Sequence, residues 1–396
     1  MTNTPGQEDH QDIREGVRRV CADFDDDYWR RCDTDHEFPW DFYRAMADGG
    51  WIGIAIPEVY GGGGRGITEA SIVVEEVAAS GAAMNGASAI HLSIFGMGPV
   101  VKHGSAELRE RVLPRVASGE LQVAFGVTEP DAGTDTSRIT TRATLAADGR
   151  DYLVRGRKVW TTKAPYCEKV LLPVRTTRRE DVARPTDGMT LLLADLQRHG
   201  EVRPEVTITP IAKAGRNAVV SCEVAYDDLP VAVADRVGEE GEGFRLLLDG
   251  LNPERILIAA EALGIGRAAL RRAVAYAGER VVFDRPIGQN QGIAFPLARA
   301  HMELRAAELV IRDAAARYDA GLPCGEAANA AKFLAAEAGY AAADQAVQTL
   351  GGMGYASEYH VERYWREARL LRLAPVSQEL VQAYIATHVL GLPRSY

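Results

Sequence analysis

Cysteine is scarce in this chain, with five residues among 396. The five are widely scattered, and no C-x-x-C pair or other short metal-ligand spacing occurs among them. The sequence therefore supports neither a structural zinc site nor a disulfide framework, and we expect free thiols, a reducing compartment and no bound metal. The five positions are Cys21, Cys32, Cys167, Cys222 and Cys324.

Basic residues are outnumbered, with 45 Lys and Arg against 55 Asp and Glu and a net charge of −10. A surface of this sign repels phosphate backbones and anionic lipid heads, so we expect neither a nucleic acid nor a membrane partner. Residues 1–12 contain no apolar core of a signal peptide. The uncharged stretch 82–101 is interrupted by Asn85, His91 and Pro99, which favours buried helices over a membrane span. We expect a cytoplasmic protein.

Several common catalytic motifs are missing. The sequence contains no G-x-x-x-x-G-K-[ST], H-E-x-x-H or G-x-S-x-G, so P-loop, zincin and nucleophile-elbow chemistries lose their usual support. Gly61, Gly63 and Gly66 formally satisfy G-x-G-x-x-G. A dinucleotide site also needs an acidic residue after the following helix to hold a ribose, and 82–101 contains none. We predict an ordinary loop there.

The chain does contain three regions of different hydrophobic period. Residues 12–119 show helical periodicity, and 121–229 consist of short β-branched runs separated by turn residues. From residue 243 onward, alanine-rich helical stretches return. The order α, β, α argues for two helical units that flank a small β-domain.

These periods predict an α+β protein of three domains. The N-terminal helical domain spans 1–120, the middle antiparallel β-barrel or sandwich domain 121–235, and the C-terminal four-helix bundle domain 236–396. The four helices of the bundle are expected at 256–282, 295–318, 327–350 and 377–390.

Three segments stand out as possible ligand contacts. Residues 125–135 run from a strand into a loop dense in Gly, Thr and Asp, which can present N–H groups and hydroxyls to a planar ligand. Trp160 and Thr162 pair a flat ring with a hydroxyl one strand later. Residues 348–355 end a long helix with three glycines, which allow close backbone approach. Taken alone, each segment also fits a structural role: a turn, a sheet-core Trp and a helix cap.

Together these segments resemble the acyl-CoA dehydrogenase family over nearly the whole chain. One family signature is similar to Val-Thr-Glu-Pro-Asp-Ala-Gly-Thr-Asp at 127–135, and the other to Gln-Thr-Leu-Gly-Gly-Met-Gly-Tyr at 348–355. Two signatures at the right separation are hard to obtain by chance. The family's Trp-x-Thr, its Arg-x-x-Phe with a later Gln, and the end of its second signature are matched by Trp160-Thr-Thr162, Arg280-Val-Val-Phe283 with Gln291, and Arg363 with Arg366.

The resemblance implies a non-covalent FAD in a crevice between the β-domain and the C-terminal helices. The residues expected to meet the isoalloxazine are Phe125, Val127, Thr128, Trp160 and Thr162, with Thr134 near the cofactor phosphates or the acyl-CoA. The residues expected to reach the adenosine half of a neighbouring subunit's FAD are Arg280, Phe283, Gln291, Gln348, Gly351 and Gly352. On an ungapped alignment Ser377 and Glu379 also fall among cofactor contacts. The resemblance further implies an acyl-CoA substrate, a homodimer or homotetramer, and an electron-transferring flavoprotein as acceptor.

Oxidising an acyl thioester to the trans-2-enoyl form needs a base over the α-carbon. Most of the family carries it in a Tyr-Glu-Gly-Thr run, where the ungapped alignment places Pro375, which cannot be a base. A smaller part of the family, including isovaleryl-CoA and long-chain enzymes, has a Glu before an Arg on a long helix. This sequence reads Leu251-Asn-Pro-Glu-Arg255 there, so the resemblance makes Glu254 the base.

Asn252 and Arg255 would then line the pantetheine path. The alternative for the same residues is a helix start, with Asn252 as N-cap, Pro253 at the first position and Glu254 favoured by the helix dipole.

Pro375 also lacks the backbone N–H that the family uses to polarise the thioester carbonyl. Losing one such donor costs about 3 kcal/mol, or ~10² in rate. Either Val376 donates instead, or the protein is not an efficient dehydrogenase of simple thioesters. The alternatives to an acyl-CoA dehydrogenase are a flavin monooxygenase or oxidase on the same fold, and a non-catalytic flavin- or CoA-binding scaffold.

Overall fold

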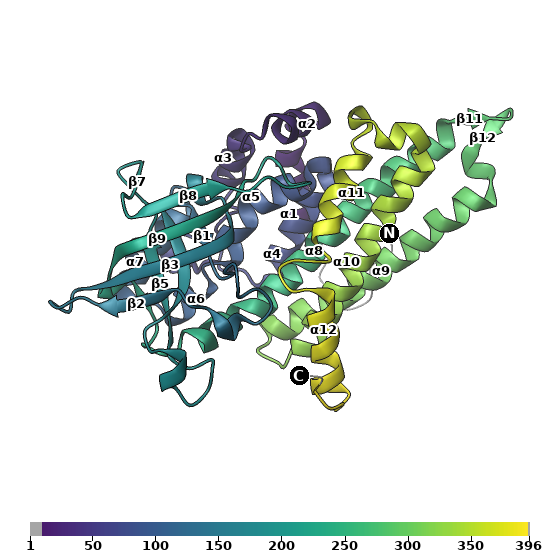
Figure 1. Cartoon of the computed structure of the whole chain (residues 1–396). Helices are drawn as coiled ribbons and strands as arrows, with labels where there is room; N and C mark the ends of the chain where they lie inside the picture. Colours follow the sequence, from purple (N-terminus) through teal and green to yellow (C-terminus); the bar gives the residue numbers. More distant parts are fainter. Residues whose placement is uncertain (1–9, 395–396) are drawn as a thin grey trace.

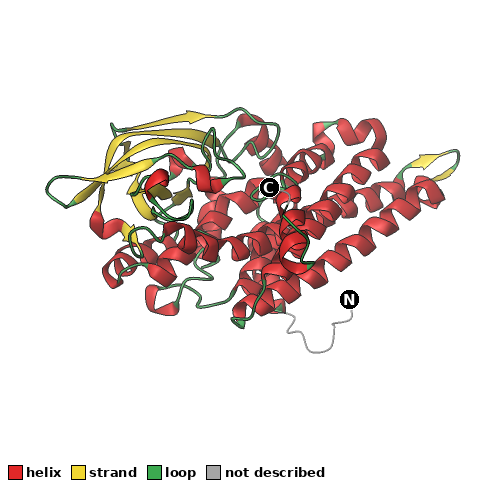
Figure 2. Cartoon of the chain, turned by 60° about the horizontal axis from the view of Figure 1, so that its bottom comes forward, coloured by secondary structure: helices red, strands yellow, loops and turns green. Residues whose placement is uncertain are grey.

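The computed structural model describes residues 10–394. Residues 1–9, on which part of the signal-peptide expectation rests, and 395–396 lie outside the described part. The large sheet lies at one end of an elongated molecule, long helices fill the rest, and the short β11–β12 hairpin (residues 281–286) lies at the opposite end (Figures 1 and 2). All five cysteines are buried and free. Within 10–394 no helix is long and apolar enough to cross a membrane, and no group of His, Cys, Asp and Glu could hold a metal.

Between residue 10 and residue 120 the N-terminal domain forms seven helices, of which α2, α3 and α4 pack against α5. Every residue of α5 is buried, and α6 follows after a break at Gly96 and Met97. This confirms that the uncharged stretch 82–101 forms buried helices. The seven are α1 (Gln11–Cys21), α2 (Asp26–Asp35), α3 (Trp40–Asp48), α4 (Ile67–Val77), α5 (Ala83–Phe95), α6 (Gly98–His103) and α7 (Ala106–Ala117).

The middle domain is a largely antiparallel sheet in the order β10-β5-β4-β2-β3-β9-β8, with β1 paired in parallel to β4. Its long central pair is β3 and β9, whose register shifts between Lys158 and Thr161. The strands are β1 (Val123–Phe125), β2 (Arg142–Leu145), β3 (Asp151–Thr162), β4 (Lys169–Arg175), β5 (Met189–Asp195), β8 (Val206–Pro210), β9 (Ser221–Ala232) and β10 (Arg236–Val237). A separate hairpin joins β6 (Gln197–Arg198) to β7 (Glu201–Val202).

The C-terminal domain is built on three long helices that pack closely through small residues. A Cβ on Gly266 of α8 would come within 3.0 Å of the Gly339 Cα on α10, and a Cβ on Gly339 would clash with the Ala262 carbonyl oxygen. Glycine is therefore required where these helices cross. The helices are α8 (Gly243–Glu279), α9 (Gln291–Asp319), α10 (Gly325–Leu350), α11 (Val361–Leu370) and α12 (Gln378–Tyr384), and the hairpin β11 (Val281–Val282) and β12 (Arg285–Pro286) links α8 to α9.

The helix boundaries differ from the predicted ones in two places. Helix α8 begins at Gly243 rather than near residue 256, because the helix continues through Pro253 instead of starting there. The predicted fourth stretch, 377–390, forms only the short α12 and a π-turn over Ile385–Val389. Helix α11, which the periodicity missed, packs against α8 and α10 in addition.

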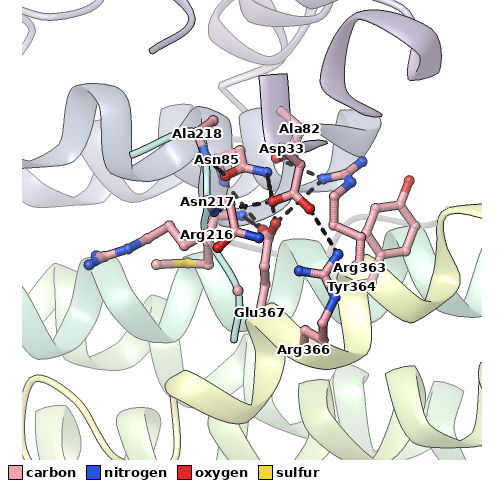
Figure 3. Close-up of polar contacts among 12 residues, drawn as sticks. Asp33, Ala82, Asn85, Arg216, Asn217, Ala218, Arg363, Tyr364, Arg366 and Glu367 are labelled. Carbon is pink, nitrogen blue, oxygen red and sulfur yellow. Dashed lines mark hydrogen bonds and ion pairs between the residues drawn. The ribbon is translucent and has the colours of Figure 1, made fainter. Parts of the chain in front are cut away.

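A buried polar cluster joins the three domains (Figure 3). Glu367 of α11 accepts hydrogen bonds from the Asn85 backbone N–H at 3.3 Å and its side-chain Nδ2 at 2.9 Å. Asp33 of α2 accepts from Asn85 Nδ2 at 3.1 Å and from the Asn217 N–H at 3.1 Å, while Asn85 Oδ1 accepts from the Ala218 N–H at 3.0 Å. These contacts fix the loop between β8 and β9 to the N-terminal domain, and its Ala214 carbonyl accepts from Arg366 Nη1 of α11 at 3.0 Å, which fixes it to the C-terminal domain.

Candidate active site

A small cavity that Glu254 helps to line lies where the three domains meet. Glu254 is 8% exposed and, among residues 10–394, is the only acidic residue in the lining. The other lining residues are apolar and come from α5, α6, β1, α8 and their connections, so no side chain there replaces water around a carboxylate. They are Phe95, Gly96, Pro99, Phe125, Leu247, Gly250 and Leu251.

The local structure of α8 excludes the helix-start interpretation of Glu254. The helix begins eleven residues earlier, at Gly243, so Asn252 is not an N-cap and Pro253 lies in the helix interior. Asn252 instead accepts a hydrogen bond through Oδ1 from Arg255 Nη1 at 3.2 Å. The macrodipole argument for an acid at this position no longer applies, because it holds only in the first turn.

Burial raises the pKa of Glu254 to about 7, with a further rise from the charge of Glu261 that the neighbouring Arg255 opposes. Desolvation disfavours the charged carboxylate and outweighs the single adjacent cation. A carboxyl group whose pKa lies near neutral pH is matched to a general base that must both accept and release a proton.

A buried acid and histidine lie behind the cavity. Glu261 follows Glu254 by two helical turns on α8, and its Oε1 lies 2.8 Å from His91 Nδ1. The His91 ring packs against Phe95 at 5.5 Å between centroids, and Phe95 packs against Phe125 at 6.0 Å. No local sequence pattern indicates a site role for Phe95, His91 or Glu261, because their proximity depends on how α5 packs against α8.

The expected isoalloxazine contacts of the β-domain lie together. The Val159 N–H donates to the Thr128 carbonyl at 2.9 Å, and Lys158 Nζ donates to the Val127 carbonyl at 3.1 Å, so this segment runs beside the end of β3. The register shift there turns Trp160 outward, with φ 63° and 55% of the residue exposed. A β-bulge re-aims a side chain in this way.

The signature loop that follows is held by a buried ion pair. Glu129 Oε1 lies 2.9 Å from Lys158 Nζ, and its other oxygen accepts from the Thr140 N–H at 2.6 Å. Burial lowers the pKa of Lys158 to about 8, although the charge of Glu129 opposes this. Thr134 is exposed in the same loop. The Glu of the signature therefore shapes the loop, a role that no local pattern indicated.

The expected adenosine contacts lie at the other end of the molecule from the sheet (Figure 1). Arg280 and Phe283 belong to the β11–β12 hairpin region, and Phe283 is 92% exposed with φ 51°. Gln291 begins α9, and Gln348, Gly351 and Gly352 follow at the exposed end of α10. One chain does not bring these residues to its own Trp160.

The two remaining predicted contacts lie at the start of α12. Ser377 is the N-cap, and its Oγ accepts from the Leu380 N–H at 3.3 Å. Glu379 is exposed in the first turn, and hydrogen bonds at that helix start lower the pKa of its carboxyl group. Glu379 therefore differs from the buried Glu254 in both solvation and pKa.

The β-domain surface around Trp160 has features that suit a flat polar cofactor. The exposed indole offers an apolar face, and the Thr162 hydroxyl lies two residues away. The Thr161 Oγ1 and Arg216 Nε are buried and have no hydrogen-bond partner within the described residues. Exposed aromatic surface next to unsatisfied polar atoms is what a bound ring system with polar edges would cover and satisfy.

The comparisons with known proteins define the class. The chain matches the N-terminal, middle and C-terminal domains of acyl-CoA dehydrogenases over residues 7–120, 124–229 and 241–390. It belongs to the acyl-CoA dehydrogenase family and is an enzyme of that family, whose cofactor is FAD.

Individual relatives agree with this assignment over the full length. The acyl-CoA dehydrogenase FadE12 of Mycobacterium tuberculosis is 39% identical over 413 aligned residues that cover all of both chains. The structure of butyryl-CoA dehydrogenase from Megasphaera elsdenii superposes with a TM-score of 0.91 at 27% identity, covering 98% of this chain and 100% of that one. The caffeyl-CoA reductase–Etf complex subunit CarC of Acetobacterium woodii is 31% identical over 88% of this chain and 89% of its own.

Proposed function

We propose that this enzyme oxidises a saturated acyl-CoA thioester to its trans-2-enoyl form, with Glu254 as the base that takes the α-proton. The observation that supports the proposal is the burial of a single carboxyl group, with a pKa raised to about 7, against an otherwise apolar cavity. An acyl chain suits such a lining, and a carboxylate there has no other evident role, because it caps no helix.

In this proposal the apolar and charged residues of the cavity have different roles. The apolar lining receives the acyl chain and excludes water, which strengthens the electrostatic interactions of the carboxylate. Glu254 accepts the α-proton through a carboxylate oxygen, and Arg255 limits the rise of its pKa so that part of the population is ionised near neutral pH. FAD supplies the hydride acceptor for the β-carbon when it is bound.

The thioester carbonyl needs a hydrogen-bond donor that Pro375 cannot supply. Pro375 is exposed between α11 and α12 and has no N–H to donate, whereas the neighbouring Val376 is buried and retains one. We assign the donor role to the Val376 N–H. A Val376→Pro exchange would then reduce turnover more than acyl-CoA binding, since a donor aimed at developing charge acts mainly in the transition state.

We further propose a homodimer or homotetramer in which one subunit completes the FAD site of its neighbour. Val281, Phe283 and Tyr355 leave large apolar side chains exposed at the end of the molecule remote from the sheet. Exposed apolar side chains that gather in one region are typical of an interaction site. A neighbour's cofactor and β-domain would cover them there.

The proposed electron acceptor is an electron-transferring flavoprotein. Its support comes from the relative CarC, which is named as a subunit of a complex with such a protein. Reduced enzyme should therefore reoxidise rapidly with an electron-transferring flavoprotein and slowly with O₂.

Anaerobic titration of the purified flavoprotein with a panel of acyl-CoA thioesters of different length and branching tests the proposal. Rapid bleaching of the flavin by at least one saturated acyl-CoA is the expected result. Turnover only with a reductant and O₂ would favour a monooxygenase or oxidase, and absence of both reactions would favour a non-catalytic scaffold. A panel that also includes acyl groups on acyl carrier protein identifies the carrier.

A further inference from the structure

Arg216 directs its side chain from the loop between β8 and β9 toward the end of β3. Its Nη2 donates to Ser221 Oγ at 2.7 Å and to Thr162 Oγ1 at 3.3 Å. Its Nε is buried and has no partner in the described part of the chain. The guanidinium therefore lies one hydroxyl group behind the surface that carries Trp160.

The backbone of Arg216 is held in an unfavourable conformation by contacts on its C-terminal side. Its φ is 57°, in the left-handed region that a non-glycine residue rarely adopts. The next two N–H groups, of Asn217 and Ala218, donate to Asp33 and Asn85 at 3.1 and 3.0 Å (Figure 3). A residue kept in such a conformation by its surroundings is positioned rather than free to relax.

The positive charge of Arg216 is not neutralised locally. Within residues 10–394 no carboxylate lies within ion-pair distance of it. Its longer-range charge interactions are with Glu261 and Glu367. Glu261 is hydrogen bonded to His91, and Glu367 accepts from the start of α5. Burial lowers the pKa of Arg216, yet a guanidinium remains charged near neutral pH.

A second cation reinforces this charge. Lys213 donates from Nζ to the Arg216 carbonyl and to the Gly215 carbonyl at 3.1 Å, and neither acceptor is anionic. Burial and the charge of Arg216 lower the pKa of Lys213 to about 8, so it remains mostly protonated at pH 7. The loop therefore places two partly buried cations beside the end of β3.

We propose that Arg216 raises the reduction potential of the FAD by stabilising the negative charge that two-electron reduction leaves on its ring system. The proposal rests on the proposed placement of the flavin against Trp160 and Thr162. A hydride brings two electrons and one proton to a neutral oxidised ring and leaves an anion. Arg216 transfers nothing in this step. Its charge lowers the free energy of the anion relative to the oxidised ring.

Thr162 extends the effect of the guanidinium toward the ring. Because Thr162 Oγ1 accepts a hydrogen bond from Arg216, its own O–H remains available to donate in another direction. A hydroxyl polarised by a cation is a stronger donor, since hydrogen bonds in a chain reinforce one another.

The test is the midpoint potential of the bound FAD, measured by dye-coupled reduction without acyl-CoA. Arg216→Gln should lower the potential, and Arg216→Lys should largely restore it. The matched control is Arg157→Gln, on strand β3 that also carries Thr162, where the arginine is exposed and pairs with Glu223 at 3.3 Å. The control should leave the potential unchanged.

Sulfite gives a second readout, because it adds to oxidised flavin and leaves a negative charge on the ring. Arg216→Gln should weaken sulfite binding on the order of 10-fold or more, and Arg157→Gln should not. Equal potentials and sulfite affinities for these two variants would overturn the proposal. Loss of FAD by Arg216→Gln, with retention by Arg216→Lys, would also count against the proposal. The positive charge would then serve to bind FAD and not to set its reduction potential.

These measurements need neither substrate nor Glu254, so the two proposals fail separately. An unreactive acyl-CoA panel with a potential that depends on Arg216 would reject the dehydrogenase proposal alone. An enzyme that oxidises acyl-CoA, but whose FAD has a reduction potential that does not depend on Arg216, would reject the Arg216 proposal alone.

Discussion

The carboxylate of Glu367 accepts a hydrogen bond from the backbone N–H of Met84 at 2.6 Å, across 283 residues of sequence. Met84 lies in the first turn of α5, where a helix leaves its N–H groups without intrahelical partners. Glu367 of α11 therefore caps a helix of another domain. Asp33, beside it, accepts from Arg366 Nη2 at 2.8 Å and extends the cluster to α2.

Asp33→Ala is expected to destabilise the protein strongly. The change leaves the Asn217 N–H without an acceptor and removes one acceptor each from Arg366 and the Asn85 amide, which keep Glu362 and Glu367 as partners. Leaving a buried polar group unsatisfied typically costs about 1–3 kcal/mol. Urea unfolding monitored by circular dichroism measures the loss. Asp27→Ala removes an exposed pair with Arg30 and should cost no more than about 1 kcal/mol. Similar losses for both variants would contradict the role assigned to the cluster.

The reaction should depend on pH through Glu254. Because only the carboxylate accepts a proton, and its pKa is raised to about 7, kcat/KM should increase from pH 6 to pH 8 and then level off. The measurement is the initial rate at low acyl-CoA concentration across that range, with flavin content checked at each pH. A profile that is flat down to pH 5 would show that the base has an ordinary carboxyl pKa.

Glu254→Gln should make the protein more stable at pH 8 than the wild type. The folded-state pKa lies above the unfolded value of 4.5, so the folded protein binds more protons between these values and loses stability as pH rises through them. Above pH 7 the buried charge costs on the order of 3 kcal/mol, which an uncharged amide avoids. Thermal unfolding at pH 8 and pH 5 checks this. The gain in Tm should shrink at pH 5, and a gain independent of pH would have another origin.

Arg280→Ala should weaken FAD retention more than it perturbs folding. A charge-assisted contact to a phosphate contributes roughly 1.5–3 kcal/mol, whereas Arg280 is exposed and ends α8 without burying its side chain. Flavin released on dilution is the readout, and light scattering reports the oligomeric state. The control is Arg299→Ala, an exposed residue of α9 paired with Glu303. A wild-type monomer with a full complement of FAD would contradict the shared site.

The sequence predicted those parts of the site that depend on local register. The strand ends near Phe125 and Trp160 follow from the pattern of β-branched runs and turn residues. The family resemblance adds the expectation that these strand ends contact FAD. The sequence does not predict the start of α8 at Gly243, because proline is common at helix starts and Pro253 therefore favours a start there. Tertiary packing allows Pro253 to lie inside this helix.

Other features could not be predicted because they depend on distant contacts. The conformation of Arg216 relies on Asp33 and Asn85, which lie 184 and 133 residues from their partners in the loop. The raised pKa of Glu254 likewise reflects burial by three domains and not its neighbours in sequence.

The rate of flavin reduction in Glu254→Gln tests the central claim most directly. The substitution keeps the shape of the side chain and removes the proton acceptor. With FAD and acyl-CoA still bound, anaerobic stopped-flow mixing should show reduction slowed by roughly 10²–10⁴-fold. Glu379→Gln, at the exposed start of α12, should reduce at a rate near that of the wild type. Rapid bleaching of the Glu254→Gln flavin by acyl-CoA would contradict the assignment of Glu254 as the base.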